Sequence, residues 1–269
     1  MRIAHATDFH LSVETPTPHN VDTWSAFDWS VGAAEEADAD VLLVGGDLCF
    51  RVGEEGVYRR VADRLERFPG EWFVVPGNHD DRALFGPALG RRYAQRPDYR
   101  WLDRRVFVGG LPIVLVDSAD GTLADEQIAW LDWTLADHER AVGEGRAPAI
   151  LPIVVHHPII TGIHRYMDGA YRLTNAERVQ EVLGKGRRTT PLVLAGHYHC
   201  AAETHAPDGV GRIEQLVTPS LFVNINPEAH EFVQSGEPHA IRIVDLDDAG
   251  GAFRSWLVPR STHIEGLVS

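Results

Sequence analysis

The chain has 269 residues, of which 44% are hydrophobic and 24% are charged, as in an ordinary soluble globular protein. Its formal net charge of -14 excludes a sequence-independent nucleic-acid binder, because such proteins need a basic surface to displace counterions from phosphates. No apolar run approaches the roughly 20 residues that a membrane-spanning helix requires. We therefore expect neither nucleic acid nor a membrane as a partner.

The first part of the chain alternates between apolar, strand-like runs and amphipathic, helix-like stretches. Strands are predicted at residues 3–7, 41–45 and 72–75, and helices at residues 21–37 and 54–68. This alternation is typical of a parallel sheet that is covered by helices.

The middle of the chain continues the mixed pattern. A strand pair is predicted at residues 105–109 and 112–116, followed by a helix at 124–138 with an apolar stripe. Two further strands are predicted at 150–155 and 192–195.

The helical signal fades after residue 200. Runs at 213–217, 240–246 and 253–258 predict strands of a second sheet with antiparallel edges. We expect a single domain over residues 1–269 with an α/β fold, a four-layer αββα sandwich of mixed sheets with flanking helices. The part from about 201–269 is predicted to complete the second sheet and to carry oligomer contacts.

Five short polar motifs each follow a strand-like run, at the point where the strand ends. The ends of strands in α/β proteins form the edge at which ligands bind, so we expect the motifs to converge there. Asp, Asn and His are side chains that hold divalent transition metals. The five motifs are Asp8-Phe9-His10, Gly45-Gly46-Asp47, Gly77-Asn78-His79-Asp80, His156-His157-Pro158 and Gly196-His197-Tyr198-His199.

The motifs are informative mainly as a set. Asp8 and His10 are two residues apart and can point to one side of an extended chain, but such a pair is weak evidence alone. Asp47 alone could equally cap a turn. Together, however, the motifs supply more ligands than one ion can hold. That surplus predicts two metal ions about 3.5 to 4 Å apart.

In this order the motifs resemble the signature of the calcineurin-like metallophosphoesterases. Within that superfamily the chain is most similar to the class III cyclic-nucleotide phosphodiesterases and the related glycerophosphodiesterases, and the similarity covers most of residues 1–200. The resemblance implies that Asp8, His10 and His199 hold a first metal, and that Asn78, His156 and His197 hold a second. Asp47 would bridge the two ions.

Either histidine of the pair His156-His157 could face the metals, so His157 is an alternative ligand. Its other possible role is to support the neighbouring ligands. The resemblance makes His79 and Asn78 the catalytic residues. His79 would stabilise the phosphoryl oxygens or protonate the leaving alkoxide, while a hydroxide shared by the two ions attacks phosphorus. Bracing of the turn is the alternative role of His79.

The expected activity is hydrolysis of a small-molecule phosphodiester, either a 3',5'-cyclic nucleotide such as cAMP or a glycerophosphodiester. Action on a phosphomonoester is a second hypothesis, and a non-catalytic protein-binding scaffold is a third. Loops at 12–20, 82–99 and 161–173 are predicted to line the substrate pocket, with His19 and His164 as candidate contacts.

The expected cofactors are two divalent or mixed-valence metal ions, Mn or Fe in the first place and Zn or Co as alternatives. A homo-oligomer, dimer or higher, is expected from the family. A cytoplasmic location is predicted, because a cleaved leader would remove Asp8 and His10.

Overall fold

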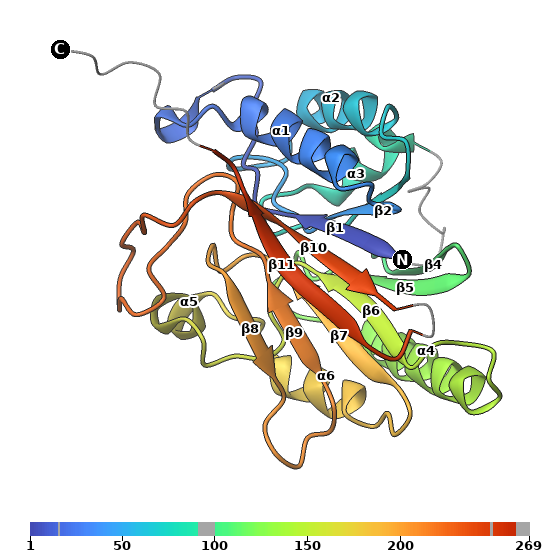
Figure 1. Cartoon of the computed structure of the whole chain (residues 1–269). Helices are drawn as coiled ribbons and strands as arrows, with labels where there is room; N and C mark the ends of the chain where they lie inside the picture. The colour runs from blue at the N-terminus through green and yellow to red at the C-terminus, as the bar shows by residue number, and fades with distance from the viewer. Residues whose placement is uncertain (16, 91–99, 248–249, 262–269) are drawn as a thin grey trace.

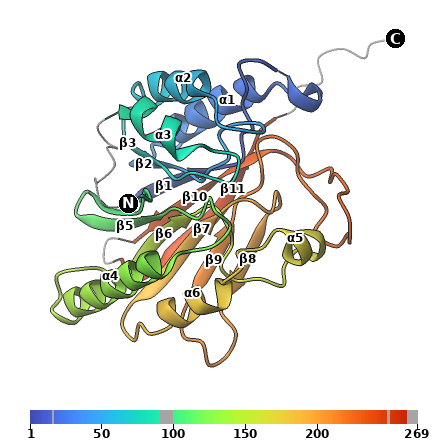
Figure 2. The same ribbon diagram turned by 180° about the vertical axis from the view of Figure 1, so that it is seen from behind.

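Two β-sheets lie face to face between two layers of helices (Figures 1 and 2). The computed structural model describes residues 1–15, 17–90, 100–247 and 250–261. The predicted αββα sandwich is confirmed. Within the described ranges, none of the helices has the length and apolar character needed to cross a bilayer.

The first sheet has the strand order β11-β10-β1-β2-β3. Its centre is a parallel set formed by β1 (Arg2–Ala6), β2 (Val41–Val44) and β3 (Glu71–Val74). The strand β10 (Ala240–Leu246) runs antiparallel to β1, and β11 (Phe253–Pro259) runs antiparallel to β10.

The second sheet has the order β4-β5-β6-β7-β9-β8, with four parallel strands inside and an antiparallel strand at each edge. Its strands are β4 (Arg104–Val108), β5 (Leu111–Val116), β6 (Ile150–Val155), β7 (Thr190–Ala195), β8 (Ala202–His205) and β9 (Glu214–Val217).

Helices cover the outer face of each sheet, as the two opposite views make clear (Figures 1 and 2). The first sheet is covered by α1 (Thr23–Glu36), α2 (Glu55–Leu65) and α3 (Arg82–Ala88). The second is covered by α4 (Asp125–Gly143) and α6 (Ala176–Leu183).

Two short helices lie in loops that we expected to border a pocket. They are η1 (Pro18–Asn20) and α5 (Arg165–Ala170). The predicted loop at 82–99 contains α3, and its residues 91–99 lie outside the described part of the chain.

The alternation of side chains along each strand fills both the outer and the central layers. On β2, Leu42 and Val44 pack under the helices, whereas Val41 and Leu43 face the other sheet. All four are buried. A strand that is covered on both faces reads as an unbroken apolar run, which is why the parallel strands were recognisable in the sequence.

The C-terminal part of the chain divides between the two sheets. The strands β8 and β9 complete the second sheet as predicted, but β10 and β11 join the first sheet. The prediction that residues 201–269 complete the second sheet is therefore wrong for these two strands. The physical reason is that β10 packs Ile241 and Ile243 into the helix-covered core of the first sheet and pairs with the open edge of β1.

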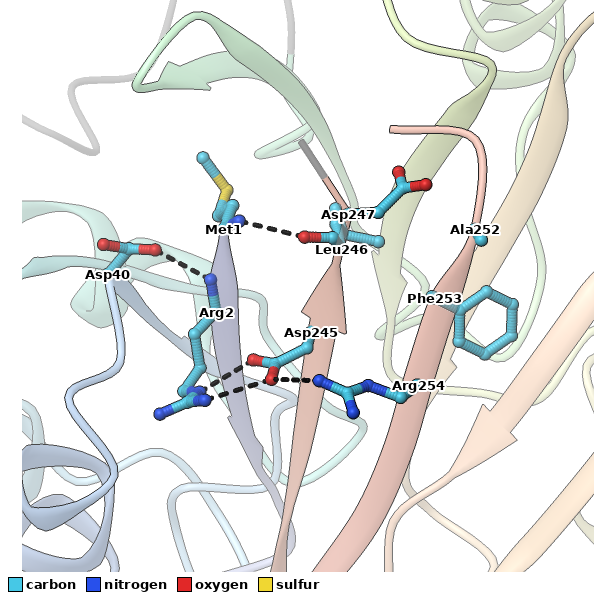
Figure 3. Close-up of a pocket in the computed structure, with 9 residues that line it drawn as sticks. All are labelled: Met1, Arg2, Asp40, Asp245, Leu246, Asp247, Ala252, Phe253 and Arg254. Atoms are coloured by element: carbon cyan, nitrogen blue, oxygen red, sulfur yellow. Dashed lines mark hydrogen bonds and ion pairs between the residues drawn. The ribbon is translucent and has the colours of Figure 1, made fainter. Parts of the chain in front are cut away.

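Polar contacts fix the register of β10 at the amino end of β1 (Figure 3). The amino group of Met1 donates to the carbonyl oxygen of Leu246 at 3.1 Å, and Arg2 Nε lies 2.7 Å from Asp245 Oδ1. These contacts border a cavity of about 570 Å³. It lies at the opposite end of β1 from Asp8 and His10.

Replacement of a side chain between the two sheets should destabilise the fold. Leu43 is fully buried there, so Leu43→Ala should lower the free energy of unfolding by about 2–5 kcal/mol through lost burial and a residual cavity. Urea denaturation monitored by circular dichroism measures the change. Val52→Ala is the control, because Val52 is 69% exposed. Equal losses in the two variants would contradict this placement of Leu43.

Candidate metal centre

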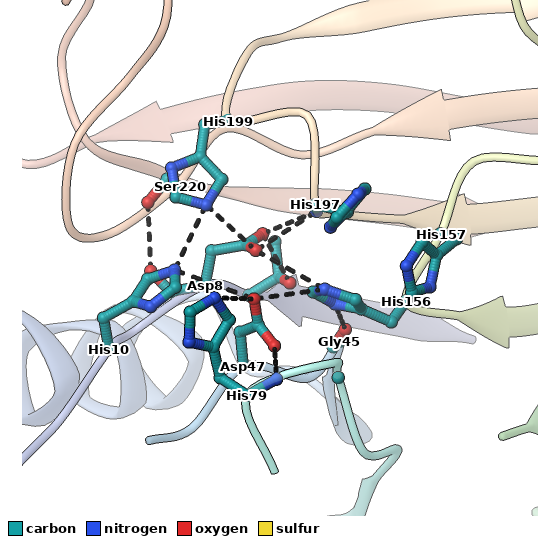
Figure 4. A network of polar contacts seen from close by, with 12 residues as sticks. Asp8, His10, Gly45, Asp47, His79, His156, His157, His197, His199 and Ser220 are labelled. Atoms are coloured by element: carbon teal, nitrogen blue, oxygen red, sulfur yellow. Dashed lines mark hydrogen bonds and ion pairs between the residues drawn. The ribbon is translucent and has the colours of Figure 1, made fainter. Parts of the chain in front are cut away.

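The loops that follow β1, β2, β3, β6 and β7 meet at one edge of the sandwich (Figure 4). Within the first sheet, Asp8 N donates to Gly46 O at 3.1 Å, and within the second, Gly196 N donates to His156 O at 3.0 Å. The two sheets are joined where His197 N donates to both carboxylate oxygens of Asp8, at 3.1 and 3.0 Å. All five sequence motifs therefore converge as predicted.

Two glycines permit this close approach of loops. A Cβ atom on Gly77 would lie 2.2 Å from Asp47 Oδ1, and one on Gly196 would lie 2.4 Å from Asp8 Oδ2. Both distances are far inside van der Waals contact. The glycines of the motifs are thus required by the packing of backbone against a carboxylate.

Five residues of the motifs adopt a left-handed backbone conformation, which is uncommon for residues other than glycine. Their φ angles are 56° for Asp8, 49° for His10, 48° for Asp47, 64° for His197 and 51° for His199. Such strain persists where the surrounding structure enforces it, and it concentrates at functional sites. The strained backbone directs these side chains toward a common centre.

The first group of side chains consists of Asp8, His10 and His199. Their ligand atoms all lie within 4.8 Å of one another. His199 Nε2 is 3.3 Å from Asp8 Oδ1 and 3.1 Å from His10 Nε2. This is the set that the resemblance assigns to the first metal.

The second group consists of Asp47, His156 and His197, again within 4.8 Å. His156 Nε2 lies 3.3 Å from Asp47 Oδ2 and 4.0 Å from Asp8 Oδ1. Asp47 also lies 3.8 Å from His10 Nε2, so its carboxylate stands between the two groups. That position fits a bridging ligand.

The ring nitrogen that faces away from the centre is held by a backbone carbonyl in three of these histidines. His156 Nδ1 donates to Gly45 O at 2.8 Å, and His199 Nδ1 donates to Val223 O at 2.6 Å. His197 Nε2 donates to Tyr171 O at 2.8 Å. Each bond fixes the ring so that the other nitrogen faces the centre, as in metal-ligating histidines.

Both carboxylates are buried, and the imidazoles keep them ionised. Burial by itself raises the pKa of Asp8, but attraction to His199 and His156 outweighs it and holds the pKa below its usual range. The pKa of Asp47 is likewise held well below its usual range, chiefly by His156 against the effect of burial. Two negative charges therefore remain inside the protein.

The histidines respond in opposite directions according to their neighbours. Burial lowers the pKa of His156, but Asp47 more than offsets this and raises it to about 9. Burial dominates at His10 and His197 and lowers their pKa values to about 3 and about 4. The charged form of His156 is thus favoured beside Asp47, whereas His10 and His197 remain neutral.

These side chains fit divalent metal ions. In the described residues, His156 Nε2 is buried without a hydrogen-bond partner and points between Asp8 and Asp47. Anionic oxygens and neutral imidazole nitrogens are the donors that Mn, Fe, Co and Zn share.

His79 and Asn78 occupy the turn after β3. His79 N donates to Asp47 Oδ1 at 2.9 Å, and His79 Nε2 lies 4.0 Å from Asp47 Oδ2. The side chain of His79 is 34% exposed. Asn78 is exposed and lines, with His79 and Arg51, a cavity of about 520 Å³.

His157 points to the other side of its motif. Its Nδ1 lies 2.9 Å from Ser118 Oγ, and its ring lies 4.1 Å from the ring of His197. Figure 4 shows His157 beside His197, while His156 faces the two carboxylates. The geometry favours His156 as the ligand and His157 as a support for His197.

The two loop histidines differ in access. His19 is exposed, and its ring lies 5.8 Å from the ring of Phe50. His164 is only 1% exposed and caps α5, where its Nδ1 accepts from Met167 N. His164 therefore offers almost no surface to a substrate.

Two kinds of supporting residue were not predicted from the sequence. One holds the turn after β3, and the other accepts hydrogen bonds from the histidine nitrogens that face away from the centre. Asp80 accepts from Gly77 N at 2.9 Å and from Leu48 N at 3.2 Å, and Tyr58 Oη donates to it at 3.1 Å. Asp80 stood in a motif, which was a usable signal. The carbonyls of Tyr171 and Val223 had none, because any residue supplies one.

Fold and site together define an αββα hydrolase whose sheet edge carries His and Asp groups that could hold divalent metal ions. The chain belongs to the calcineurin-like phosphoesterase family, which matches residues 1–201. The predicted family is thereby confirmed.

Known relatives support this assignment along most of the chain. A probable cyclic nucleotide phosphodiesterase of Fibrobacter succinogenes is 25% identical, over 91% of this chain and 89% of its own. The glycerophosphodiester phosphodiesterase GpdQ of Enterobacter lignolyticus is 29% identical, over 86% and 81%. A dimetal phosphatase of Danio rerio shares the fold with a TM-score of 0.64 at 14% identity, over 95% and 98%.

Enlarging Gly77 should damage the centre without touching a ligand. In Gly77→Ala the new Cβ would displace Asp47, so the amount of metal bound per chain should fall from about two ions to one or fewer. Inductively coupled plasma mass spectrometry measures it. Gly32→Ala, on α1 with no atom within 4 Å of its Cβ, should keep both ions. Full metal content in Gly77→Ala would contradict the close packing.

Proposed function

We propose that this protein is a phosphodiesterase that uses two divalent metal ions to hydrolyse small phosphodiesters. The observation that carries the proposal is the pair of buried ligand groups, with the carboxylate of Asp47 between them. The names of the relatives from Fibrobacter succinogenes and Enterobacter lignolyticus, a cyclic nucleotide and a glycerophosphodiester phosphodiesterase, support the diester.

Seven side chains would hold the ions. When bound, two such ions lower the pKa of a water, bind phosphate oxygens and offset the charge that develops in the transition state. We assign Asp47 to both ions. The first ion would take Asp8, His10 and His199, and the second Asn78, His156 and His197.

His79 is placed to act on the substrate itself. Its ring lies edge-on to His10 with centroids 5.0 Å apart, and a third of the side chain is open to the cavity. An imidazolium at this position can donate a hydrogen bond to a phosphoryl oxygen and then a proton to the departing alkoxide. Asn78, the preceding residue, would orient the phosphate through its carboxamide.

The cavity next to His79 has room for a small molecule. Its volume of about 520 Å³ is within the range of small-molecule sites. Arg51 and Arg82 contribute guanidinium groups to its lining, and Arg82 Nε is fixed 2.6 Å from Asp117 Oδ2. Arg82 also pairs with Asp120 at 2.8 Å, so among the described residues that line the cavity Arg51 is the cation better placed to attract a phosphate.

Several finer features stay predictions. Mn or Fe is our proposed occupant, with Zn or Co as alternatives, since mixed nitrogen and oxygen ligands accept all four. A homo-oligomeric assembly and a cytoplasmic location are likewise proposed from the family and the sequence.

A substrate panel tests the diester assignment. We expect the Mn-loaded protein to hydrolyse 3',5'-cyclic AMP or glycerophosphoethanolamine with a higher kcat/KM than AMP or glycerol 3-phosphate. The products, AMP from cyclic AMP and a phosphomonoester with its alcohol from glycerophosphoethanolamine, are measured by chromatography. Faster turnover of monoesters than of every diester would favour a phosphomonoesterase. Two bound ions without turnover of any ester would favour a scaffold.

Loss of His79 should slow turnover more than it weakens metal binding. His79→Ala should lower kcat about 10²-fold or more, because a poor leaving group departs without its proton donor. Metal content should stay at the wild-type value. The matched control is His205→Ala, since His205 is exposed on the edge strand β8. An unchanged kcat in His79→Ala would leave His79 with the role of bracing its turn.

A further inference from the structure

One buried tyrosine stands between two of the proposed metal ligands. Tyr198 follows His197 and precedes His199, so it belongs to the turn that carries one ligand of each proposed ion. Its side chain is 0% exposed and shares a small apolar cluster with Met167 and Cys200. A ring that is closed off from solvent cannot contact a substrate. Any role of Tyr198 in the site is therefore exerted through the turn.

The turn that contains Tyr198 has a strained backbone. The φ angles of its two histidines, 64° at His197 and 51° at His199, lie in the left-handed region. Between them, Tyr198 N donates to Gly196 O at 2.7 Å, which closes the chain over only three residues. Strained backbone persists where the surrounding structure enforces it. The turn therefore needs an anchor outside its own residues.

The hydroxyl of Tyr198 provides such an anchor. Tyr198 Oη donates to Asp168 Oδ1 at 2.6 Å. The other oxygen of Asp168 accepts from two backbone groups, Gly162 N at 3.0 Å and His164 N at 2.7 Å. Three donors thus fix the carboxylate in place. Hydrogen bonds to a carboxylate are among the stronger ones in proteins, so the position of Tyr198 is well determined.

The helix α5 holds the same turn at a second point. Asp168 lies in α5, and Tyr171, which follows the helix, accepts the hydrogen bond from His197 Nε2 at 2.8 Å through its carbonyl oxygen. Tyr171 N in turn donates to Met167 O at 2.8 Å, so both points belong to one short helix. One contact acts on a ligand ring, and the other acts on the backbone between the two ligands.

We propose that Asp168 is a positioning residue for both proposed metal ions, because it fixes, through Tyr198, the turn that carries His197 and His199. This inference rests on the ligand sets of the proposed function and adds a residue that is itself no ligand. Without the bond to Asp168, the strained turn can relax in the metal-free protein. Metal binding then has to restore the ligand geometry, and the apparent affinity falls with the fraction of protein that retains it.

Metal affinity tests the proposal. Tyr198→Phe removes only the hydroxyl, and it should raise the dissociation constant of Mn²⁺ about tenfold, the effect of one hydrogen bond to a carboxylate. The number of ions bound at saturation should stay at about two. Isothermal titration of the metal-free protein with manganese chloride measures both values. An unchanged dissociation constant in Tyr198→Phe would overturn the proposal.

The matched control removes a hydroxyl from the same helix. Tyr166 lies in α5, and its hydroxyl donates to the hydroxyl of Tyr171 at 3.3 Å in an exposed position. Tyr166→Phe should therefore leave the dissociation constant of Mn²⁺ at the wild-type value. An equal loss of affinity in Tyr166→Phe and Tyr198→Phe would contradict a specific role of the bond to Asp168.

A double-mutant cycle separates positioning from a general loss of stability. If Tyr198 acts through Asp168, the variant with both Tyr198→Phe and Asp168→Ala should bind Mn²⁺ no more weakly than Asp168→Ala alone. Additive losses would overturn the proposal, because the two side chains would then act independently. Urea denaturation of the metal-free variants gives the folded fraction at the titration temperature. A loss of affinity that only follows the loss of folded protein would overturn it as well.

The outcomes distinguish this inference from the proposed function, because the titration contains no ester. A wild-type protein that binds two ions and hydrolyses no ester contradicts the phosphodiesterase, and the comparison of Tyr198→Phe with Tyr166→Phe still decides the role of Asp168. An unchanged affinity in Tyr198→Phe contradicts the positioning role and leaves the phosphodiesterase intact. A wild-type protein that binds no Mn²⁺ contradicts both.

Discussion

The burial of two carboxylates at the same edge is the constraint on which the structure depends. Asp8 is fully buried and Asp47 is 2% exposed. Charges removed from water are costly unless opposite charge compensates them. His156 and His199 supply part of it, and the pKa values of both are raised for this reason despite burial. The carboxylates that stabilise a proton on these imidazoles would also stabilise a doubly charged metal ion between them. The candidate metal ligands and the buried charges are therefore the same side chains.

The sandwich provides this cluster because parallel strands of two sheets end at one edge. Each of the two ligand groups described above takes residues from both sheets. Asp8 comes from the first sheet and His199 from the second, and the hydrogen bonds from His197 N to Asp8 tie the sheets together. The site therefore depends on the central core, including Leu43, that fixes the distance between the sheets. Stability and metal binding are linked through this core.

Much of this arrangement could be predicted from the sequence, for a physical reason. Strands buried on both faces give unbroken apolar runs, and ligands at strand ends give short polar motifs after them. The edge that β10 joins was not predictable, because strand periodicity carries no information on pairing partners. The contact between the rings of Phe50 and Phe222, whose centroids are 5.6 Å apart, was missed as well. Phe50 and Phe222 are 172 positions apart, and a single aromatic residue in a loop gives no signal of its own.

The loops that support the metal ligands also shape the substrate side. Val223 O fixes His199, and its neighbour Phe222 contacts the ring of His10. Tyr171 O fixes His197, while the side chain of Tyr171 is 49% exposed at the surface. A backbone carbonyl can accept a hydrogen bond from an imidazole whatever side chain its residue carries. Side chains in these loops can therefore change to suit a new leaving group while the backbone keeps the ligands in place. The loops can thus divide the two tasks between backbone and side chains.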